Sequence, residues 1–154
     1  MRRRSNMKIV DASLSHVAEI AGLERTCFSA PWSEKAITET MQGDSVFLVA
    51  EEDGKVVGYI GSYHCHPEGY VTNVAVAPEM RRRGIGRALV EELIARGKGL
   101  SLSFWTLEVR ESNEGAIALY SSIGFKKVGK RPRFYSNPEE AALLMTYYMD
   151  TQKA

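Results

Sequence analysis

The sequence predicts a single-domain α/β (α+β) protein with one mixed, mostly antiparallel sheet of about seven strands flanked by about four helices. The length of 154 residues suits one domain with a real core and is too short for two ordinary ones. Two apolar runs around Asp53-Gly54 indicate an antiparallel hairpin in the first half. In the second half, apolar strands alternate with amphipathic helices, which indicates strand–helix–strand units.

The first half predicts a strand, two helices and three further strands. A mostly apolar stripe that includes Ile20, Leu23 and Glu24 indicates the first helix. Pro31 separates it from a second helix, for which Ser33 is a suitable N-cap. The expected ranges are 8–11 for the first strand, 15–27 and 33–41 for the helices, and 46–51, 55–64 and 70–77 for the other strands.

The second half predicts a helix, a strand, a helix and two closing strands. Gly97 and Gly99 are expected to end the first of these helices, and Asn113 and Gly124 suit the N-cap and C-cap of the second. The strand between the helices has few polar breaks, as is typical of a central strand covered on both faces. The expected ranges are 84–96 and 113–123 for the helices and 104–109, 125–129 and 142–149 for the strands, with a polar segment at 131–140.

The domain is expected to occupy residues 7–150, with a disordered basic tail at 1–6 and a short tail at 151–154. No apolar run follows the basic start, so we expect no secretory signal, and no stretch approaches the ~20 residues of a membrane span. Cys27 and Cys65 lack a metal-ligand spacing and are expected to be reduced thiols of a cytoplasmic protein. A net charge of +1 excludes a surface that binds nucleic acid as a whole, so any polyanion site must be local.

The stretch 73–87 predicts such a local site, because an apolar strand runs into a basic, glycine-bearing turn that opens a helix. Backbone N–H groups at a helix start are unpaired, and the helix dipole adds positive charge there. Gly84 and Gly86 allow close approach of a ligand to the backbone. Arginine side chains are positively charged, whereas a helix start favours negative charge. Their presence there indicates that an anion binds among them. The arginines in question are Arg81, Arg82, Arg83 and Arg87.

Two further residues have the chemistry of proton transfer. Period two places Glu108 on the polar face of its strand, where it is either a general base or half of a salt bridge with a basic neighbour such as Arg110. Tyr120 shares a helix face with Asn113 and is either a functional hydroxyl or a core aromatic residue. Glu108 and Tyr120 point to one pocket if that pocket lies between their strand and helix.

Several motifs together resemble one family. The pattern Arg81-x-x-Gly84-x-Gly86 after the strand resembles the acetyl-CoA signature of the GNAT N-acetyltransferases. The order of strands and helices from residue 7 to residue 150 is similar to the whole GNAT fold. Three separated motifs, at 28–34, 107–113 and 116–125, look like the RimI branch of that family, which contains bacterial N-terminal acetyltransferases.

The resemblance implies that acetyl-CoA is the co-substrate and that no metal takes part. Glu108 is then the general base, and Tyr120, with an ordinary pKa near 10, is the general acid. The implied acceptor is a protein N-terminus, the N-terminal alanine of a ribosomal protein. The residues implied to hold the co-substrate are Val74, Ala75 and Val76 on the strand, Arg81, Arg82, Arg83, Gly84, Ile85, Gly86 and Arg87 in the turn, and Asn113 beyond it.

The chemistry favours an α-amine acceptor that attacks the thioester directly. An α-amino group has a pKa of about 7.7–8.0 and a lysine side chain one near 10.4, so an N-terminus is far more often neutral at pH 7. Neither cysteine has the sequence context of an activated nucleophile, so no acetyl-enzyme is expected. Two loops are expected to frame the acceptor, unless their side chains serve only packing and solubility. The candidates in them are Trp32, Glu34, Arg133 and Tyr135.

Other functions stay open at this point. A GNAT enzyme could instead acetylate a lysine side chain, a polyamine or another small amine. A non-catalytic acetyl-CoA sensor would need neither Glu108 nor Tyr120. An RNA-binding protein is disfavoured by the near-zero net charge, and no direct nucleic-acid or membrane partner is expected.

Overall fold

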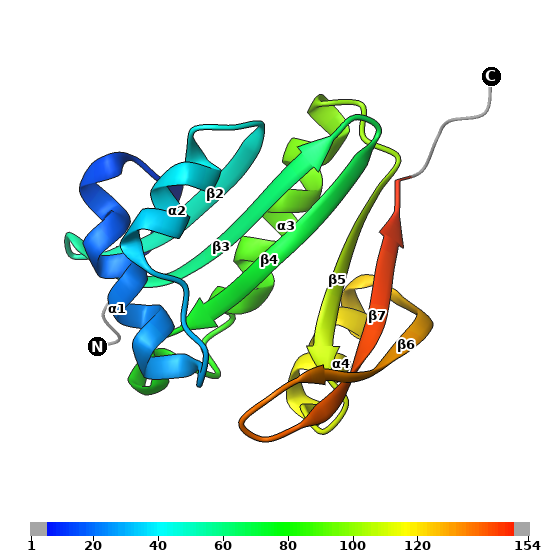
Figure 1. The fold of residues 1–154 in the computed structure, drawn as a ribbon. Coiled ribbons are helices and arrows are strands. Elements are labelled where there is room, and N and C mark those ends of the chain that lie inside the picture. The colour runs from blue at the N-terminus through cyan, green and yellow to red at the C-terminus, as the bar shows by residue number, and fades with distance from the viewer. Residues whose placement is uncertain (1–5, 150–154) are drawn as a thin grey trace, which may run out of the picture.

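The computed structural model describes residues 6–149 and contains one seven-stranded sheet in the order β1-β2-β3-β4-β5-β7-β6 (Figure 1). In chain order the elements are β1 (Lys8–Asp11), the 3-10 turn η1 (Leu14–His16), α1 (Val17–Cys27), α2 (Glu34–Met41), β2 (Ser45–Glu52), β3 (Lys55–Cys65), β4 (Glu68–Val76), the 3-10 turn η2 (Pro78–Met80), α3 (Ile85–Gly99), β5 (Phe104–Arg110), α4 (Glu114–Ile123), β6 (Lys126–Tyr135) and β7 (Glu140–Tyr148). The predicted fold class is confirmed: the β4–β5 pair is parallel and the other neighbouring strands are antiparallel.

Both predicted tails fall largely outside the described residues. Of the basic tail at 1–6 only Asn6 is described, and its Nδ2 donates a hydrogen bond of 3.1 Å to Asp53 Oδ1. The tail at 151–154 and the predicted domain limit at residue 150 also lie outside the described part. Within residues 6–149, no helix is both long enough and apolar enough to span a membrane.

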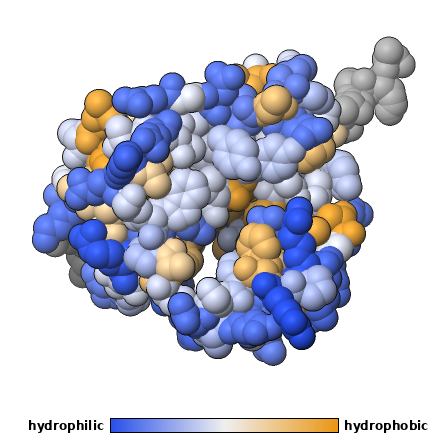
Figure 2. Space-filling view, viewed as in Figure 1, coloured by the Kyte–Doolittle hydropathy of each residue, from blue (hydrophilic) through white to orange (hydrophobic). Residues whose placement is uncertain are grey.

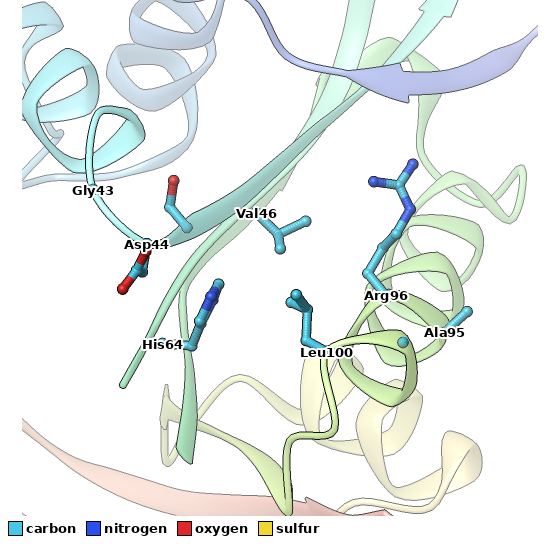
Figure 3. Close-up of a pocket in the computed structure, with 9 residues that line it drawn as sticks. Gly43, Asp44, Val46, His64, Ala95, Arg96 and Leu100 are labelled. Carbon is cyan, nitrogen blue, oxygen red and sulfur yellow. The ribbon is translucent and has the colours of Figure 1, made fainter. Parts of the chain in front are cut away.

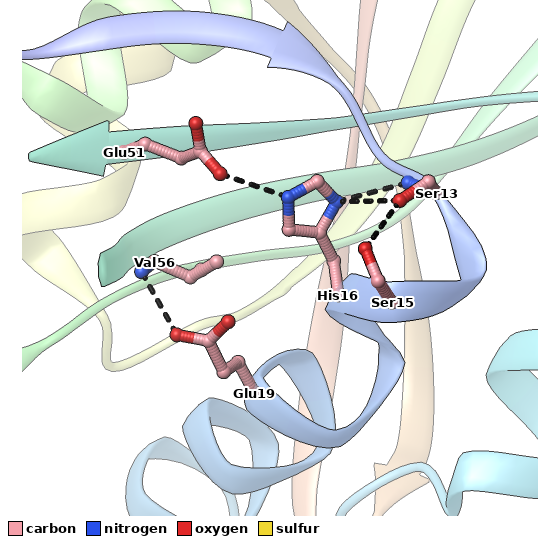
Figure 4. A network of polar contacts seen from close by, with 6 residues as sticks. All are labelled: Ser13, Ser15, His16, Glu19, Glu51 and Val56. Atoms are coloured by element: carbon pink, nitrogen blue, oxygen red, sulfur yellow. Dashed lines mark hydrogen bonds and ion pairs between the residues drawn. The ribbon is translucent and has the colours of Figure 1, made fainter. Parts of the chain in front are cut away.

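The predicted helix 15–27 begins with a 3-10 turn before α1, and His16 fixes this start (Figure 4). The Ser13 backbone N–H donates to His16 Nδ1 at 2.9 Å, so the ring proton lies on Nε2, which donates to Glu51 Oε2 at 2.8 Å. One turn later, Glu19 Oε2 accepts from the Val56 N–H at 3.1 Å. These bonds attach α1 to β2 and to the start of β3.

The sheet carries a hydrophobic core on each face. In Figure 1, α1 and α2 lie on the face toward the viewer and α3 lies behind the sheet. One core packs under α1 and α2 around Ile20, Ile37 and Tyr59, and the other packs under α3 around Leu89 and Trp105. Both helical layers are needed because a seven-stranded sheet of this composition has apolar side chains on both faces.

Gly97 does not end α3 as predicted, because the helix continues to Gly99. A Cβ atom at Gly97 would lie 2.3 Å from Trp105 Nε1, and one at Gly69 would lie 2.5 Å from the Trp105 ring. The indole N–H donates to the Leu93 carbonyl at 3.1 Å. Both glycines therefore leave space for the buried Trp105 side chain, which packs between α3 and β5.

The centre of the sheet splits between β4 and β5. These strands pair only over Glu68–Tyr70 and Phe104–Thr106, and beyond that point they diverge (Figure 1). A register shift against β3 leaves Thr72 as a bulge in β4 near the start of the split. β5 remains paired with β7 along its whole length. The split leaves one edge of β4 open. One face of β5 is only half-buried, so the prediction that β5 is covered on both faces is wrong.

The polar segment predicted as a loop at 131–140 is mostly strand. β6 extends to Tyr135, and its partner β7 begins at Glu140. Lys130 and Arg131 pair with Leu143 and Ala142 of β7. β6 is an edge strand that is exposed along most of its length, so charged side chains are tolerated there and the composition resembles that of a loop.

Candidate active site

A cavity of about 700 Å³ occupies the split between β4 and β5. Its walls come from the end of α1, the α1–α2 loop, β3, β4, β5, α4 and the end of β6. The space-filling view of the same face shows a hollow near the middle of the molecule (Figure 2). This central cavity joins elements from both faces of the sheet, so two ligands can approach one point from opposite sides.

A second recess of about 490 Å³ lies between the start of β2, the end of β3 and the end of α3 (Figure 3). His64, Leu100 and Arg96 line it. The Arg96 guanidinium is already paired with Asp11 at 2.6 Å and Glu92 at 3.0 Å. Asp44 and His64 also line this recess, but neither residue was predicted to be functional, whereas Glu108 and Tyr120 both line the central cavity, so we place the candidate active site there.

Glu108 reaches the central cavity from the open face of β5, opposite Trp105 and Leu107. Its side chain is 31% exposed, and its Oε2 lies 3.4 Å from Arg131 Nε of β6. The predicted alternative, a salt bridge with a basic neighbour, is thus met by Arg131, whereas Arg110, the neighbour named as an example, pairs with Glu140 at 3.1 Å. Glu108 thus has one long contact with a cation and remains open to a ligand.

Tyr120 reaches the same cavity from α4 and is 8% exposed. Its ring packs on Phe125, with the centroids 5.6 Å apart. Burial, with a smaller contribution from Tyr135, raises the pKa of Tyr120 above its ordinary value. The ordinary value expected from the sequence is therefore wrong, and the phenol keeps its proton well above pH 10.

Arg110 anchors the β6–β7 turn over the cavity, a role that the sequence analysis missed. It donates to Glu140 Oε1 at 3.1 Å and to the carbonyl oxygens of Pro138 and Ser136 at 3.0 and 3.1 Å. Its guanidinium carbon lies 4.5 Å from the centre of the Tyr135 ring. Burial and the Glu108 charge raise the pKa of Tyr135 to about 12. This role depends on partners 26 to 30 positions away, so no short sequence pattern indicated it.

A buried carboxylate on α1 fixes the opposite wall. Glu24 is fully buried, and its Oε1 accepts the Trp32 backbone N–H at 2.9 Å. Its Oε2 accepts from Asn73 Nδ2 at 2.9 Å and from the Tyr59 hydroxyl. Burial and, to a smaller extent, the nearby Glu24 carboxylate raise the pKa of Tyr59. The sequence analysis counted Glu24 within an apolar stripe, whereas the structure uses it to hold the α1–α2 loop against β3 and β4.

Replacing Glu24 with Ala is expected to destabilise the fold by about 3–5 kcal/mol, because one buried N–H, one hydroxyl and one amide lose their acceptor together. Urea unfolding measures the free-energy change. Glu34→Ala, in the exposed first turn of α2, is the matched control and should change stability far less. Equal losses in the two variants would show that the Glu24 network does not stabilise the fold.

The basic turn before α3 has the backbone of an anion site. Gly84 is the N-cap of α3, with φ +80°. It has no side chain that could accept a hydrogen bond, so the first N–H groups of the helix have no acceptor from the N-cap side chain. Arg82 is also left-handed, with φ +65°. The Arg81 Nε donates to the Val76 carbonyl at 3.1 Å, which makes Arg81 a brace for the end of β4. Arg81 therefore has a partner within the protein, and its presence in the turn does not require the bound anion that the sequence predicted.

Two other arginines of the turn also have partners within the protein. Arg83 lies 3.4 Å from Glu52, and Arg87 lies 3.5 Å from Glu91 and donates to Ser122. All of these side chains are exposed and their ion pairs are long or at the surface, so the contacts are weak enough to be exchanged for a phosphate.

The remaining predicted residues fall into two groups. Val74, Asn113, Trp32 and Tyr135 line the central cavity, and Asn113 Oδ1 also caps α4 by accepting the Ala116 N–H at 3.1 Å. The others lie outside its lining. Ala75 and Ile85 are buried in the two cores, and Arg133 pairs with Glu139 at 3.2 Å. The remaining ones are Val76, the glycines and arginines of the turn, and Glu34 at the start of α2.

The edge of β4 that faces β5 is unpaired beyond Tyr70, so its backbone groups can bond a strand-like ligand arm. That edge ends close to the basic turn, where phosphates bind well. In the described part of the chain, no three His, Cys, Asp or Glu side chains gather closely enough to hold a metal ion. An unpaired strand edge and a basic helix start therefore lie on one side of the central cavity.

Comparison with known proteins identifies the class. The acetyltransferase (GNAT) family model matches residues 17–125. The chain therefore belongs to the GNAT family and is an acetyltransferase.

Several of its relatives are alanine N-acetyltransferases of ribosomal protein bS18. The Escherichia coli ribosomal protein bS18-alanine N-acetyltransferase is 33% identical over 125 residues, which are 80% of this chain and 84% of that protein. A crystal structure of that Escherichia coli enzyme superposes with a TM-score of 0.89 at 28% identity and covers 96% of both chains. A GNAT acetyltransferase from Elizabethkingia anophelis with acetyl-CoA bound has a TM-score of 0.75, covers 94% of this chain and 99% of its own, and at 19% identity shares the fold.

Proposed function

We propose that this protein transfers the acetyl group of acetyl-CoA to the N-terminal α-amine of a protein, the N-terminal alanine of a ribosomal protein. The observation that supports this most is the meeting of Glu108 and Tyr120, from β5 and α4, in one cavity at the β4–β5 split. The ribosomal acceptor rests on the enzymes that the chain resembles, whose names give that substrate.

The residues around the split fit acetyl-CoA as co-substrate. The open edge of β4, including Val74 to Val76, would bond the amides of the pantetheine arm. The uncapped start of α3, from Gly84 to Arg87, would bind the pyrophosphate with backbone N–H groups, and Arg82 and Arg83 would add charge. When bound, acetyl-CoA supplies an activated thioester.

Glu108 and Tyr120 divide the proton transfers. Glu108, directly or through one water, takes the proton that the amine loses as its nitrogen bonds to the acetyl carbon. As the carbon–sulfur bond breaks, Tyr120 provides a proton for the departing sulfur. The high pKa of Tyr120 keeps this proton available across the working range of pH. The transfer is direct, so both substrates occupy the cavity together.

The acceptor half of the cavity suits a peptide. Trp32, Phe134 and Tyr135 provide flat apolar surfaces, and two of them are held by the Glu24 and Arg110 anchors. An α-amine needs less help from a base than a lysine does, since its pKa is about 7.7–8.0. A partly exposed carboxylate such as Glu108 is sufficient for it.

The test is release of CoA with a lysine-free peptide that begins with a free alanine, compared with the same peptide blocked at its N-terminus. We expect turnover with the free peptide alone and initial rates that fit a ternary complex. Equal turnover with the blocked peptide, or a stable acetyl-enzyme, would contradict the proposal.

Tyr120→Phe should slow turnover by about tenfold or more while leaving the fold intact. A raised folded-state pKa means that the phenol is still protonated at pH 10, so the ratio of wild-type to variant rates should stay constant from pH 8 to pH 10. A pH–rate series on both proteins measures this ratio. A ratio that collapses toward one near pH 10 would mean that Tyr120 ionises normally.

A further inference from the structure

Four aromatic side chains form a continuous row across four strands on the face of the sheet opposite α3. We call this the aromatic row, and its members are Tyr63 on β3, Tyr70 on β4, Phe104 on β5 and Tyr148 on β7. Successive ring centroids lie 5.1, 6.4 and 6.3 Å apart. Tyr63 pairs directly with Tyr70, and Phe104 pairs directly with Tyr148, in the strand register.

The two ends of the aromatic row are exposed, and its two middle members are half-buried. Tyr63 is 45% exposed and Tyr148 is 57% exposed. The helices α1 and α2 cover the part of this face nearer β2, and the part over β5 and β7 is bare (Figure 1). The Tyr70 hydroxyl donates to Glu68, which holds its ring in place. A contiguous, pre-oriented aromatic surface of this kind is typical of a binding site.

The aromatic row is continuous with the central cavity, because Tyr63 and Tyr70 belong to both. Phe104 and Glu108 lie four residues apart on the same face of β5, which is about 13 Å along a strand. An extended polypeptide spans about 3.3–3.6 Å per residue, so about four residues cover this distance.

We infer that the aromatic row is the docking track for the acceptor chain, taking apolar or aromatic side chains from about the fourth residue onward. The inference rests on the proposed function and adds to it. Acceptor recognition then extends beyond the residue that is acetylated, and the stacked rings provide it at low entropic cost because they are already ordered.

The experiment compares kcat/KM for a three-residue and an eight-residue peptide that share an N-terminal alanine, the longer one carrying aromatic residues from position four. With the wild type we expect about a tenfold advantage for the longer peptide. Tyr148→Ser, outside the cavity lining, should remove most of this advantage and leave the rate on the short peptide unchanged. Leu14→Ser, which alters a side chain 63% exposed on η1, is the control and should keep the advantage.

The outcomes separate the two proposals. Turnover of both peptides with equal kcat/KM, or an advantage that survives Tyr148→Ser, would overturn the docking track and leave the proposed function standing. A Tyr148→Ser protein that changes from dimer to monomer in sedimentation, with no effect of peptide length, would make the aromatic row a contact between copies and also overturn it. No turnover of either peptide would overturn both.

Discussion

Glu108→Gln is expected to lower kcat by about a hundredfold or more and to leave the Kd for acetyl-CoA nearly unchanged. The amide keeps the shape of the carboxylate and cannot accept the proton from the attacking amine. Glu108 lies on β5 and lines the central cavity, whereas the turn that is proposed to bind phosphates lies outside the cavity lining. Steady-state kinetics and a direct binding titration separate the two effects.

Glu139→Gln is the matched control, because Glu139 lies in the β6–β7 turn, pairs with Arg133 and is outside the cavity lining. Its turnover should stay within a few-fold of the wild type. A Glu108→Gln protein with full turnover would remove the general base. A large loss of acetyl-CoA affinity would instead give Glu108 a structural role, through its contact with Arg131.

Gly84→Glu is expected to weaken acetyl-CoA binding by about a hundredfold or more. A side chain at φ +80° costs roughly 1–2 kcal/mol of strain, and a carboxylate at the start of α3 repels the pyrophosphate. A Cβ atom at Gly84 would meet no atom within 4 Å, so the fold itself has room for the substitution. Calorimetric titration with acetyl-CoA measures the change.

Gly84→Asn separates charge from backbone conformation, because asparagine tolerates left-handed φ values and is neutral. We expect its affinity to stay within about tenfold of the wild type, which is about 1.4 kcal/mol. If Gly84→Glu bound acetyl-CoA normally, the pyrophosphate site would have to lie elsewhere. If Gly84→Asn lost as much affinity as Gly84→Glu, backbone strain rather than charge would explain the loss.

Local signals were enough to predict most of the fold. Ser33 and Asn113 cap their helices as their residue types indicate, since each accepts an N–H three residues ahead. The hairpin at Asp53-Gly54 and the alternation along β5 are also local patterns. The polar edge strand β6 was not predictable in this way, because its pairing with β7 satisfies the backbone while its side chains remain in water.

The site was predictable only where a chemical signal stood in the sequence. Glu108 and Tyr120 stand out as a carboxylate in an apolar strand and a phenol on a capped helix, and the structure brings both to one cavity. The anchors of that cavity depend on distant partners. Glu24 meets Asn73 across 49 positions, and Arg110 meets Glu140 across 30, so no short pattern announces either contact.

The central claim is direct acetyl transfer to an N-terminal α-amine in the central cavity. The most direct test is a single peptide that carries both a free N-terminal alanine and a free lysine side chain, with the product mapped by fragmentation mass spectrometry at low conversion. The account predicts acetylation on the α-amine and none on the lysine. Acetyl groups mainly on the lysine would contradict it and would assign the cavity to side-chain amines.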